Sequence, residues 1–525
     1  MGPVSEDGGV VVSTGGGAPQ GACEVDPTEL SAGLSEGAGA AFRLAVIGAG
    51  PAGLGAACAA ADAGVQAVLL DLGERIGGQF YRHAPEQAQA REGSPYHHAW
   101  GEFAVLRAAF ERHRQAGRIV HLPRHAVWSV TALSPGSGFA VRAIEGERER
   151  RARELRAGAV VIATGAYDRQ LPFPGWTLPG VMAGGGAQAL LKGSLTAPGR
   201  RAVVAGTGPF LLAVADALLT AGVQVAEVAE ANDPLRMLAH PRAWPGTVTK
   251  LGEALGYGAA LLRSRVPYRR RTMVIAAHGE GRLEAVTLAR VDHDWKLIPG
   301  SERRVACDLL ATGFGFTPQV ELALAAGCAS TLGTDGSLVI RADREGRSSV
   351  PGIYVAGETT GVGGAELALI EGRLCGLAVA AELGGGTGAE VVAAGPRLRR
   401  RERQLRAFAQ ALHGAHHVQA GWVGRLSDET LICRCEEVRY GAVREALEEL
   451  GAVDARAVKL LARPGMGWCQ GRICGAVVAA LVAERHGTQP SHADLAAMSK
   501  RVLGNPVPLA DLAALHTATG QKSDM

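Results

Sequence analysis

Short apolar runs separated by turn residues begin at residue 42, after a leader rich in Gly, Ala and Ser. Residues 44–47 form a continuous apolar run that predicts a buried parallel strand. The alanine-rich stretch 54–63 predicts a helix, and residues 66–70 predict a second strand. The same strand–helix–strand order returns between residues 201 and 231. This pattern predicts an α/β fold with two Rossmann-like nucleotide-binding domains.

The turn between the first predicted strand and helix carries Gly48, Gly50 and Gly53 in the order G-x-G-x-x-G. The first glycine permits the tight turn, the second lets the backbone approach a pyrophosphate, and the third allows close helix–strand packing. The N–H groups at the start of the helix then face the phosphates. Asp71 follows the second strand, where a carboxylate bonds a ribose hydroxyl. These four residues together predict a dinucleotide site.

The second strand–turn–helix–strand unit keeps only some of this pattern. Gly206 and Gly208 supply the first two glycines, but Leu211 stands at the third position. Glu227 or Glu230 could meet a ribose, and neither is a basic residue suited to a 2′-phosphate. We therefore expect NAD rather than NADP as a candidate second nucleotide. A nucleotide fold without a ligand is the alternative.

Four cysteines near the C-terminus stand in two close pairs. Their thiolates suit an iron–sulfur cluster or a structural zinc ion, although a Cys-x-Cys pair is less usual in zinc ribbons. Unlinked core thiols are the third alternative. Short helices are expected over residues 443–450, 455–461 and 475–485, and the last would point its N-terminus at an anionic cluster. The candidate metal ligands are Cys433, Cys435, Cys469 and Cys474.

Composition excludes several classes of function. Apolar residues make up 47% of the chain and charged residues 20%, which excludes general disorder. The net charge of +3 and the 5% of aromatic residues do not indicate a nucleic-acid partner. No apolar run has the length of a membrane-spanning helix, and residues 1–40 lack the apolar stretch of a signal peptide. We expect a cytoplasmic protein whose other cysteines are unpaired thiols.

The residues around these motifs extend the first prediction. Gly77, Gly78 and Gln79 follow Asp71, and this extension resembles the two-dinucleotide-binding flavoprotein superfamily. In that superfamily the stretch contacts FAD, and segments that end in Ala-Thr-Gly mark the crossings between the two nucleotide domains. Gly357 and Glu358 stand where most members have Gly-Asp, near the ribityl chain and phosphates of the flavin. The resemblance thus implies FAD and adds Gly78, Gln79, Thr164, Gly165, Gly357 and Glu358 to its site.

The cysteine spacing resembles the [2Fe-2S] domain of bacterioferritin-associated ferredoxins, except that it closes with Cys-x4-Cys instead of Cys-x2-Cys. The longer form is similar to the one fused to FAD-containing α subunits of opine oxidases, proline and hydroxyproline dehydrogenases and hydrogen cyanide synthases. Residues 165–193 and 357–378 also look like that group. The resemblance implies FAD, a [2Fe-2S] cluster and a hetero-oligomeric amine or amino-acid dehydrogenase. Its partners would be an amino-acid-oxidase-like flavoprotein β subunit and an electron acceptor, and a small iron–sulfur subunit is a further candidate.

Two other functions stay open at this point. One is a self-contained NAD(P)H-dependent reductase that uses FAD and the cluster to reduce an electron carrier. The other is a scaffold or redox-sensing subunit without catalysis. No grouping of acid–base residues marks a catalytic site, so the catalytic residues are unassigned. The expected layout is a flexible leader (1–40), an FAD-binding domain in two segments (41–170 and 308–390) that enclose a NAD-type domain (171–307), a basic linker helix (391–425), a [2Fe-2S] domain (426–490) and a tail (491–525).

Overall fold

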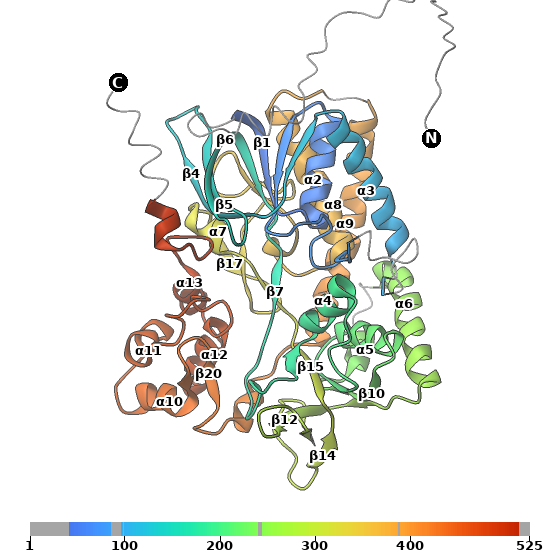
Figure 1. Ribbon diagram of the computed structural model, residues 1–525, viewed down its shortest axis with the longest axis vertical. Helices are drawn as coiled ribbons and strands as arrows, with labels where there is room; N and C mark the ends of the chain where they lie inside the picture. Colours follow the sequence, from blue (N-terminus) through green and yellow to red (C-terminus); the bar gives the residue numbers. More distant parts are fainter. Residues whose placement is uncertain (1–40, 86–95, 98, 240–243, 387–388, 514–525) are drawn as a thin grey trace, which may run out of the picture.

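The computed structural model describes residues 41–85, 96–97, 99–239, 244–386 and 389–513. Figure 1 shows a first domain (41–168 and 316–382), a second domain (181–313) and a helical cysteine module (426–499) at the side. The expected leader and residues 514–525 of the expected tail lie outside the described residues.

The first domain is built on a sheet whose parallel core has the order β3-β2-β1-β6, with β19 also paired to β6. The C-terminal half of β6 joins this core, and its N-terminal half pairs with the antiparallel strand β5. Helices α2, α3 and α8 cover one face of the sheet. The elements are β1 (Ala41–Ile47), α2 (Pro51–Asp62), β2 (Ala67–Leu70), α3 (Trp100–Gln115), β3 (Ile119–Leu122), β4 (His125–Ala132), β5 (Phe139–Glu145), β6 (Arg151–Ile162), α7 (Glu321–Ala325), β17 (Ser330–Leu332), β18 (Leu338–Ile340), β19 (Ile353–Val355), η4 (Gly357–Thr360) and α8 (Ala365–Glu382).

Small residues bring α2 and α8 into backbone contact. A Cβ atom added at Gly372 would lie 1.9 Å from the Ala52 carbonyl oxygen, and one added at Gly376 would lie 2.3 Å from that of Ala56. The two glycines are one helical turn apart, so they fall on the same face of α8. This close contact places the N-terminus of α2 beside the segment that leads into α8.

The second domain contains a parallel sheet of order β11-β10-β9-β15-β8 and a three-stranded antiparallel sheet, β12-β13-β14. Helices α4 and α5 pack on the parallel sheet around the same core. The elements are β8 (Val181–Ala183), α4 (Gly184–Ser194), β9 (Arg201–Gly206), α5 (Phe210–Thr220), β10 (Gln224–Glu230), η2 (Pro234–Ala239), α6 (Trp244–Arg263), β11 (Tyr268–Arg270), β12 (Thr272–His278), β13 (Ala285–Arg290), β14 (Arg303–Ala306) and β15 (Leu309–Gly313).

The boundary expected after residue 307 differs from the structure. Strand β15 pairs in parallel with β9 and β8, so Leu309–Gly313 belongs to the second domain. The chain returns to the first domain through β16 (Phe316–Pro318), which pairs antiparallel with β7 (Ala166–Asp168), the outgoing crossing. The two crossings therefore lie side by side between the domains.

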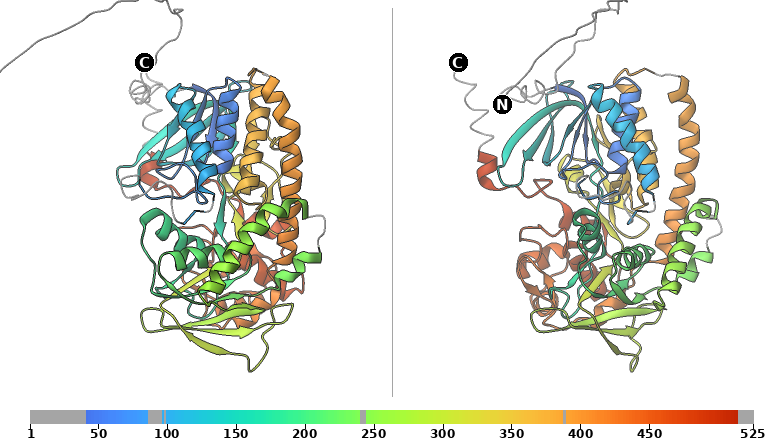
Figure 2. Two further views of the ribbon diagram at one scale, coloured as in Figure 1. Left: turned by 90° about the vertical axis from the view of Figure 1, so that its right-hand side faces the viewer. Right: turned by 45° about the vertical axis from the view of Figure 1, so that its right-hand side comes forward.

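A long helix joins the two domains to the cysteine module. Helix α9 (Ala389–Ala415) packs along α8 and reaches α6, as both views in Figure 2 show. Its basic residues pair with carboxylates of the first domain: Arg399 with Glu345 at 3.0 Å, and Arg401 with Glu366 at 2.6 Å. The expected basic linker is thus packed and charge-paired, and it is followed by η5 (Ala420–Arg425).

The cysteine module contains the three expected helices within a few residues of their predicted ends. Beyond them, residues expected as a tail form α13 and then touch the first domain: Gly504 N–H donates to the Trp128 carbonyl at 2.7 Å, and Asn505 Nδ2 donates to that of Val127 at 2.6 Å. The elements are β20 (Leu431–Cys433), β21 (Val438–Arg439), α10 (Tyr440–Glu448), α11 (Ala455–Ala462), α12 (Gly475–Arg485) and α13 (His492–Ser499).

Candidate redox cofactor sites

The first glycine turn has the geometry that a pyrophosphate requires. Gly48 has φ +107°, a conformation that favours glycine. A Cβ atom at Gly53 would lie 1.7 Å from the Gly48 carbonyl oxygen, so only glycine allows α2 to start this close to β1. At Gly50 the nearest atom to an added Cβ is the Gly78 Cα, at 3.9 Å. The protein therefore fills the space beside Gly53, whereas the space beside Gly50 is open to a ligand.

Asp71 stands at the edge of this turn. Its Oδ2 accepts from Ala49 N–H at 2.5 Å, and its Oδ1 accepts from Gly73 N–H at 2.6 Å. A carboxylate has about four acceptor sites, so two backbone donors leave room for ribose hydroxyls. Burial raises the pKa of Asp71, and the two backbone N–H groups oppose that shift.

The expected extension after Asp71 closes against the glycine turn. Gly77 N–H donates to the Ala49 carbonyl at 2.8 Å, and a Cβ atom at Gly78 would lie 2.8 Å from the Gly50 Cα. Gln79 follows and lines the same cavity as the turn. Residues that lie apart in the sequence thus come together as a single cradle.

The end of β6 and the first crossing form the next wall. Thr164 Oγ1 donates to the Gln319 carbonyl at 2.9 Å, and Gln319 N–H donates to the Gly165 carbonyl at 2.9 Å. These bonds tie the outgoing and returning crossings together beside the cradle. Both Thr164 and Gly165 line the cavity.

Gly357 and Glu358 begin η4, and Glu358 lines the same cavity as the cradle. Gly357 has φ +78°, and Glu358 Oε1 accepts from Gly364 N–H at 2.9 Å. Burial raises the pKa of Glu358 to about 7. Glu371 Oε2 accepts from Gly357 N–H at 3.2 Å, and Glu371 Oε1 forms an ion pair with Arg406 of α9. Sequence reasoning missed this supporting pair, because the basic run of α9 gave no signal of its partner.

A single continuous cavity of about 2090 Å³ connects these groups. This is larger than the roughly 300–1,000 Å³ of most small-ligand sites and has room for a dinucleotide. The glycine cradle, the acid at the ribose position and the N-terminus of α2 are the groups that FAD requires. The residues present therefore fit FAD, and the same cavity extends to the second glycine turn and to the cysteine pairs.

The second turn resembles the first in its backbone but not in its acid. Gly206 and Gly208 have φ +147° and +103°. Glu230, not Glu227, occupies the position that corresponds to Asp71: its Oε2 accepts from Gly208 N–H at 2.8 Å and its Oε1 accepts from Asn232 N–H at 2.9 Å.

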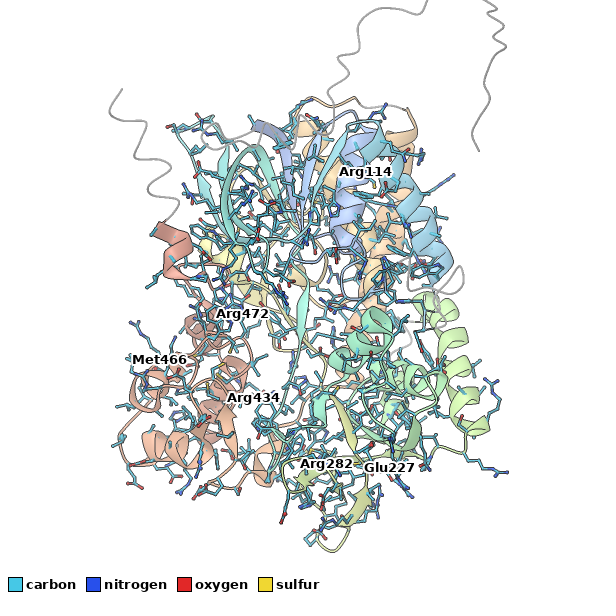
Figure 3. The ribbon with its side chains drawn as sticks, in the orientation of Figure 1. Arg114, Glu227, Arg282, Arg434, Met466 and Arg472 are labelled. Carbon is cyan, nitrogen blue, oxygen red and sulfur yellow. The ribbon has the colours of Figure 1, made fainter. Side chains whose placement is uncertain are left out.

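The structure does not bring Glu227 to this turn. Its carboxylate pairs with Arg303 of β14 at 2.6 Å and with Arg269 of β11 at 3.5 Å. Figure 3 shows Glu227 in the lower region of the second domain, near β10. The expectation that Glu227 meets a ribose is therefore corrected, because ion pairs within the second domain hold this side chain.

The end of α9 lies against the second turn. Asn232 Nδ2 donates to Thr207 Oγ1 and to the His417 carbonyl, each at 2.9 Å, and Trp295 Nε1 donates to Asn232 Oδ1 at 3.1 Å. Gly208 still lines the shared cavity. A second nucleotide is thus sterically allowed, but some of the polar surface of the turn is already bonded to the protein.

The four predicted cysteine ligands come together as two pairs. The thiols of Cys433 and Cys474 are hydrogen-bonded to each other, and so are those of Cys435 and Cys469. The bond from Cys474, together with backbone N–H groups, lowers the pKa of Cys433 to about 5, and the same bond with burial raises the pKa of Cys474, so the pair holds one proton between its two sulfurs. Cys433 and Cys474 are buried, whereas Cys435 is exposed.

This pairing fits two metal ions better than one. Tetrahedral zinc with Zn–S bonds of about 2.3 Å would bring all four sulfurs within about 4 Å of one another. Among the residues that the structure describes, only Asp292, His293 and Asp294 place three metal-binding atoms within 4.8 Å of one another, and the cysteines do not. Two separate pairs match a [2Fe-2S] cluster, in which each iron takes two thiolates.

Two contacts of the cysteine module were not predicted. Arg434, between two ligands, lies 5.3 Å from the centroid of the Trp176 ring, and Trp176 Nε1 donates to the Leu431 carbonyl at 2.8 Å. Arg472, between the other two ligands, contacts Tyr167 of β7. Neither contact could be predicted from the local sequence pattern, because each joins segments more than 250 residues apart.

Comparisons with known families agree with this division of the chain. Residues 42–382 match the family of pyridine nucleotide-disulphide oxidoreductases, and residues 431–484 match the BFD-like [2Fe-2S] binding domain. The first match covers both nucleotide-type domains and implies FAD. The second covers all four cysteines and implies a [2Fe-2S] cluster.

Several relatives match almost the whole chain. The A subunit of opine oxidase from Agrobacterium tumefaciens (strain Ach5) is 34% identical over 496 residues, which cover 92% of this chain and 93% of that protein. Its counterpart from Rhizobium meliloti is 32% identical, with 92% and 89% covered. Hydrogen cyanide synthase subunit HcnB of Pseudomonas aeruginosa is 31% identical, with 82% and 91% covered.

A solved structure supports the fold. The L-proline dehydrogenase from P. horikoshii superimposes with a TM-score of 0.64 at 22% identity, covering 90% of this chain and 79% of that one. Among the described residues, no helix is both long enough and apolar enough to cross a membrane. The chain belongs to the family that contains the A subunit of opine oxidase and hydrogen cyanide synthase subunit HcnB, and it is an FAD-dependent oxidoreductase subunit with a C-terminal [2Fe-2S] domain.

Proposed function

We propose that this chain is the electron-relaying α subunit of a hetero-oligomeric amine or amino-acid dehydrogenase. In this proposal a partner flavoprotein of the amino-acid-oxidase type oxidises the C–N bond of the substrate. The present chain then takes up the electrons and delivers them to an acceptor. The observation that carries the proposal is the single cavity that FAD-cradle residues and cysteine ligands line together.

The chemistry of the two groups explains why they share a cavity. A flavin exchanges electrons in pairs or singly, whereas an iron–sulfur cluster exchanges them singly. In this proposal the residues of this chain bind both groups. The paired crossings β7 and β16 lie between the two sites, and the cysteine ligands Cys433 and Cys474 are buried. This arrangement supports an internal step between the two groups rather than two independent sites.

An exit for electrons is supported by the outer edge of the cysteine module. Cys435 is exposed, and Trp468, next to the ligand Cys469, is 70% exposed. An external acceptor, or a small iron–sulfur subunit of the complex, can approach the cluster there. The other pair of ligands, Cys433 and Cys474, is buried, and all four ligands line the shared cavity, so we place the entry of electrons at the cavity.

The second candidate function is a self-contained NAD(P)H-dependent reductase. It is favoured by the second glycine turn, because Gly208, Pro209 and Phe210 line the shared cavity. It is disfavoured by Glu230, whose carboxylate already accepts from Gly208 N–H. Gly208 corresponds to Gly50 of the first turn, and a backbone N–H that is bonded to a carboxylate is a poorer donor to a pyrophosphate.

The two functions are separated by purifying the chain with its native partners and mixing the complex with amino acids or opines under anaerobic conditions. We expect amine-dependent bleaching of the flavin followed by reduction of the cluster, and neither change when the chain is mixed with these substrates alone. Rapid bleaching of the isolated chain by NADH would instead support the reductase. A complex that stays oxidised with every amine, and a chain that stays oxidised with NADH, would refute both functions.

A further inference from the structure

The loop that carries two of the cysteine ligands is pinned to the first crossing by one buried arginine. Arg472 lies between Cys469 and Cys474, and its side chain is only 7% exposed. Its Nε donates to the Tyr167 hydroxyl at 3.0 Å, and its Nη1 donates to the Cys469 carbonyl at 3.1 Å. Its Nη2 donates to the Gly504 carbonyl. One guanidinium thus binds the cysteine loop at Cys469, the C-terminal segment at Gly504 and the crossing β7 at Tyr167.

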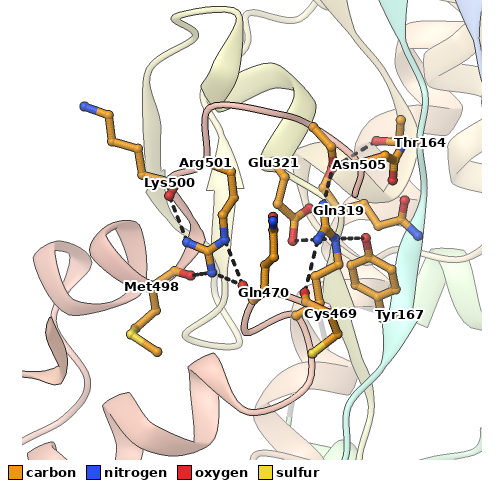
Figure 4. A network of polar contacts seen from close by, with 12 residues as sticks. Thr164, Tyr167, Gln319, Glu321, Cys469, Gln470, Met498, Lys500, Arg501 and Asn505 are labelled. Atoms are coloured by element: carbon orange, nitrogen blue, oxygen red, sulfur yellow. Dashed lines mark hydrogen bonds and ion pairs between the residues drawn. The ribbon is translucent and has the colours of Figure 1, made fainter. Parts of the chain in front are cut away.

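Tyr167 stands between the two cofactor sites. It lies on β7, three residues after Thr164, and it lines the shared cavity. Figure 4 shows Tyr167, Glu321 and Cys469 converging from separate elements, with Thr164 and Gln319 above Tyr167 in this view. The path from the flavin cradle to the cysteine ligand Cys469 therefore runs through Tyr167 and Arg472.

The charges around this loop favour an electron on the cluster. Arg472 and Arg501 both donate to backbone carbonyls of the loop, Arg472 to that of Cys469 and Arg501 Nε to that of Gln470 at 2.8 Å. The carboxylate of Glu321 lies 3.6 Å from Arg472 Nε and offsets some of the charge of these two arginines. Reduction adds a negative charge to the cluster, and nearby cations stabilise the reduced form.

We propose that Arg472 is a positioning residue for electron transfer, which fixes the cysteine loop against Tyr167 and makes the cluster easier to reduce. The proposal rests on the relay described above. In each step the reduced flavin loses one electron and the cluster gains one. A one-electron acceptor then reoxidises the cluster, so two such rounds empty a two-electron donor.

Three variants of the full chain test this role. Arg472→Gln removes the charge and the contact with Tyr167. Tyr167→Phe removes only the hydroxyl contact. Arg501→Gln is the matched control, because Arg501, just after the cysteine module, donates to the carbonyls of Gln470, Met498 and Lys500 and has no described hydrogen bond to β7. Arg472→Lys is added in case the glutamine variant does not fold.

The measurements are the midpoint potential of the cluster, by dithionite titration followed with EPR, and the rate of flavin-to-cluster transfer after photoreduction of the flavin. In Arg472→Gln we expect the midpoint potential of the cluster to fall by about 59 mV, which is a tenfold change for a one-electron couple. Electron transfer from the flavin to the cluster should be at least tenfold slower. Tyr167→Phe should slow transfer severalfold at an unchanged potential. Arg501→Gln should lower the potential but slow transfer only as far as that shift requires.

The result that would overturn the proposal is wild-type transfer and an unchanged potential in Arg472→Gln, or wild-type transfer in Arg472→Lys, which keeps the charge, with flavin and cluster contents intact. A wild-type rate of electron transfer in Tyr167→Phe would refute the role of the hydrogen bond between Tyr167 and Arg472. Failure of the relay itself looks different, because the wild-type chain would then show no transfer from flavin to cluster at all.

Discussion

Gly50→Val is expected to abolish FAD binding without unfolding the protein. Gly50 has φ −76° and ψ −176°, an extended conformation that valine adopts without strain. A Cβ atom at this position meets only the Gly78 Cα within 4 Å, at 3.9 Å, so the protein accommodates it. The rest of the valine side chain occupies the space through which the pyrophosphate approaches the turn. The substitution therefore acts on the ligand rather than on the fold.

The magnitude follows from linkage. A ligand at 100 times its dissociation constant stabilises the folded state by about 2.7 kcal/mol. In a domain of this size that corresponds to a melting temperature about 5–10 °C higher. Gly50→Val should lose this increment and at least nine-tenths of the flavin absorbance per chain, while its melting temperature without FAD stays near that of the wild-type apoprotein.

Substitutions at two other glycines serve as controls. Gly53→Ala would place a Cβ atom 1.7 Å from the Gly48 carbonyl, so it should damage the fold itself, whereas an added Cβ at Gly186 meets nothing within 4 Å and that variant should behave as wild type. Absorbance spectra and thermal unfolding with and without added FAD give all the quantities. Full flavin occupancy in Gly50→Val would refute this placement of the pyrophosphate.

Three further predictions concern the cluster, the buried acids and the linker. Cys469→Ser should remove the visible iron–sulfur absorption and leave flavin absorption intact; an unchanged spectrum would contradict its role as a ligand. Burial raises the pKa values of Glu358 and Glu371 to about 7, so the folded apoprotein binds more protons than the unfolded chain between about pH 4.5 and 7. Its free energy of unfolding should therefore fall as the pH rises through this range, and a pH-independent value in urea titrations would argue against buried, proton-binding carboxyl groups. Arg425→Met should cost about 3 kcal/mol or more, because the buried guanidinium donates to the carbonyls of residues 171, 172 and 274; denaturation curves that match wild type would show that these bonds are not needed.

The sequence was sufficient for features that depend on local order. The strand, turn and helix around Gly48 follow from neighbouring residues, because a short apolar run and a glycine turn fix the backbone over a few positions. The cysteine pairs and the helices between them follow in the same way. These features include the first glycine turn and the four cysteine ligands.

Features that depend on pairing between distant segments were beyond the sequence. Leu309–Gly313 ends in Ala-Thr-Gly like the β6 segment, and apolar pattern alone does not say which sheet it joins. Glu227 and Glu230 are three residues apart on one strand, so they point to opposite faces, and the register shift between Val225 and Glu227 decides which acid reaches the turn. The contact between Tyr167 and Arg472 joins residues 305 positions apart and has no local signal.

The proposed relay requires electron exchange between the flavin and the cluster within one chain. The decisive measurement is freeze-quench EPR and absorbance on the purified holoprotein after brief anaerobic photoreduction of the flavin. We predict that the signal of the reduced [2Fe-2S] cluster grows as the flavin reoxidises, with equal numbers of electrons lost and gained. A flavin that stays reduced beside a cluster that stays oxidised, although dithionite reduces that cluster, would contradict the account.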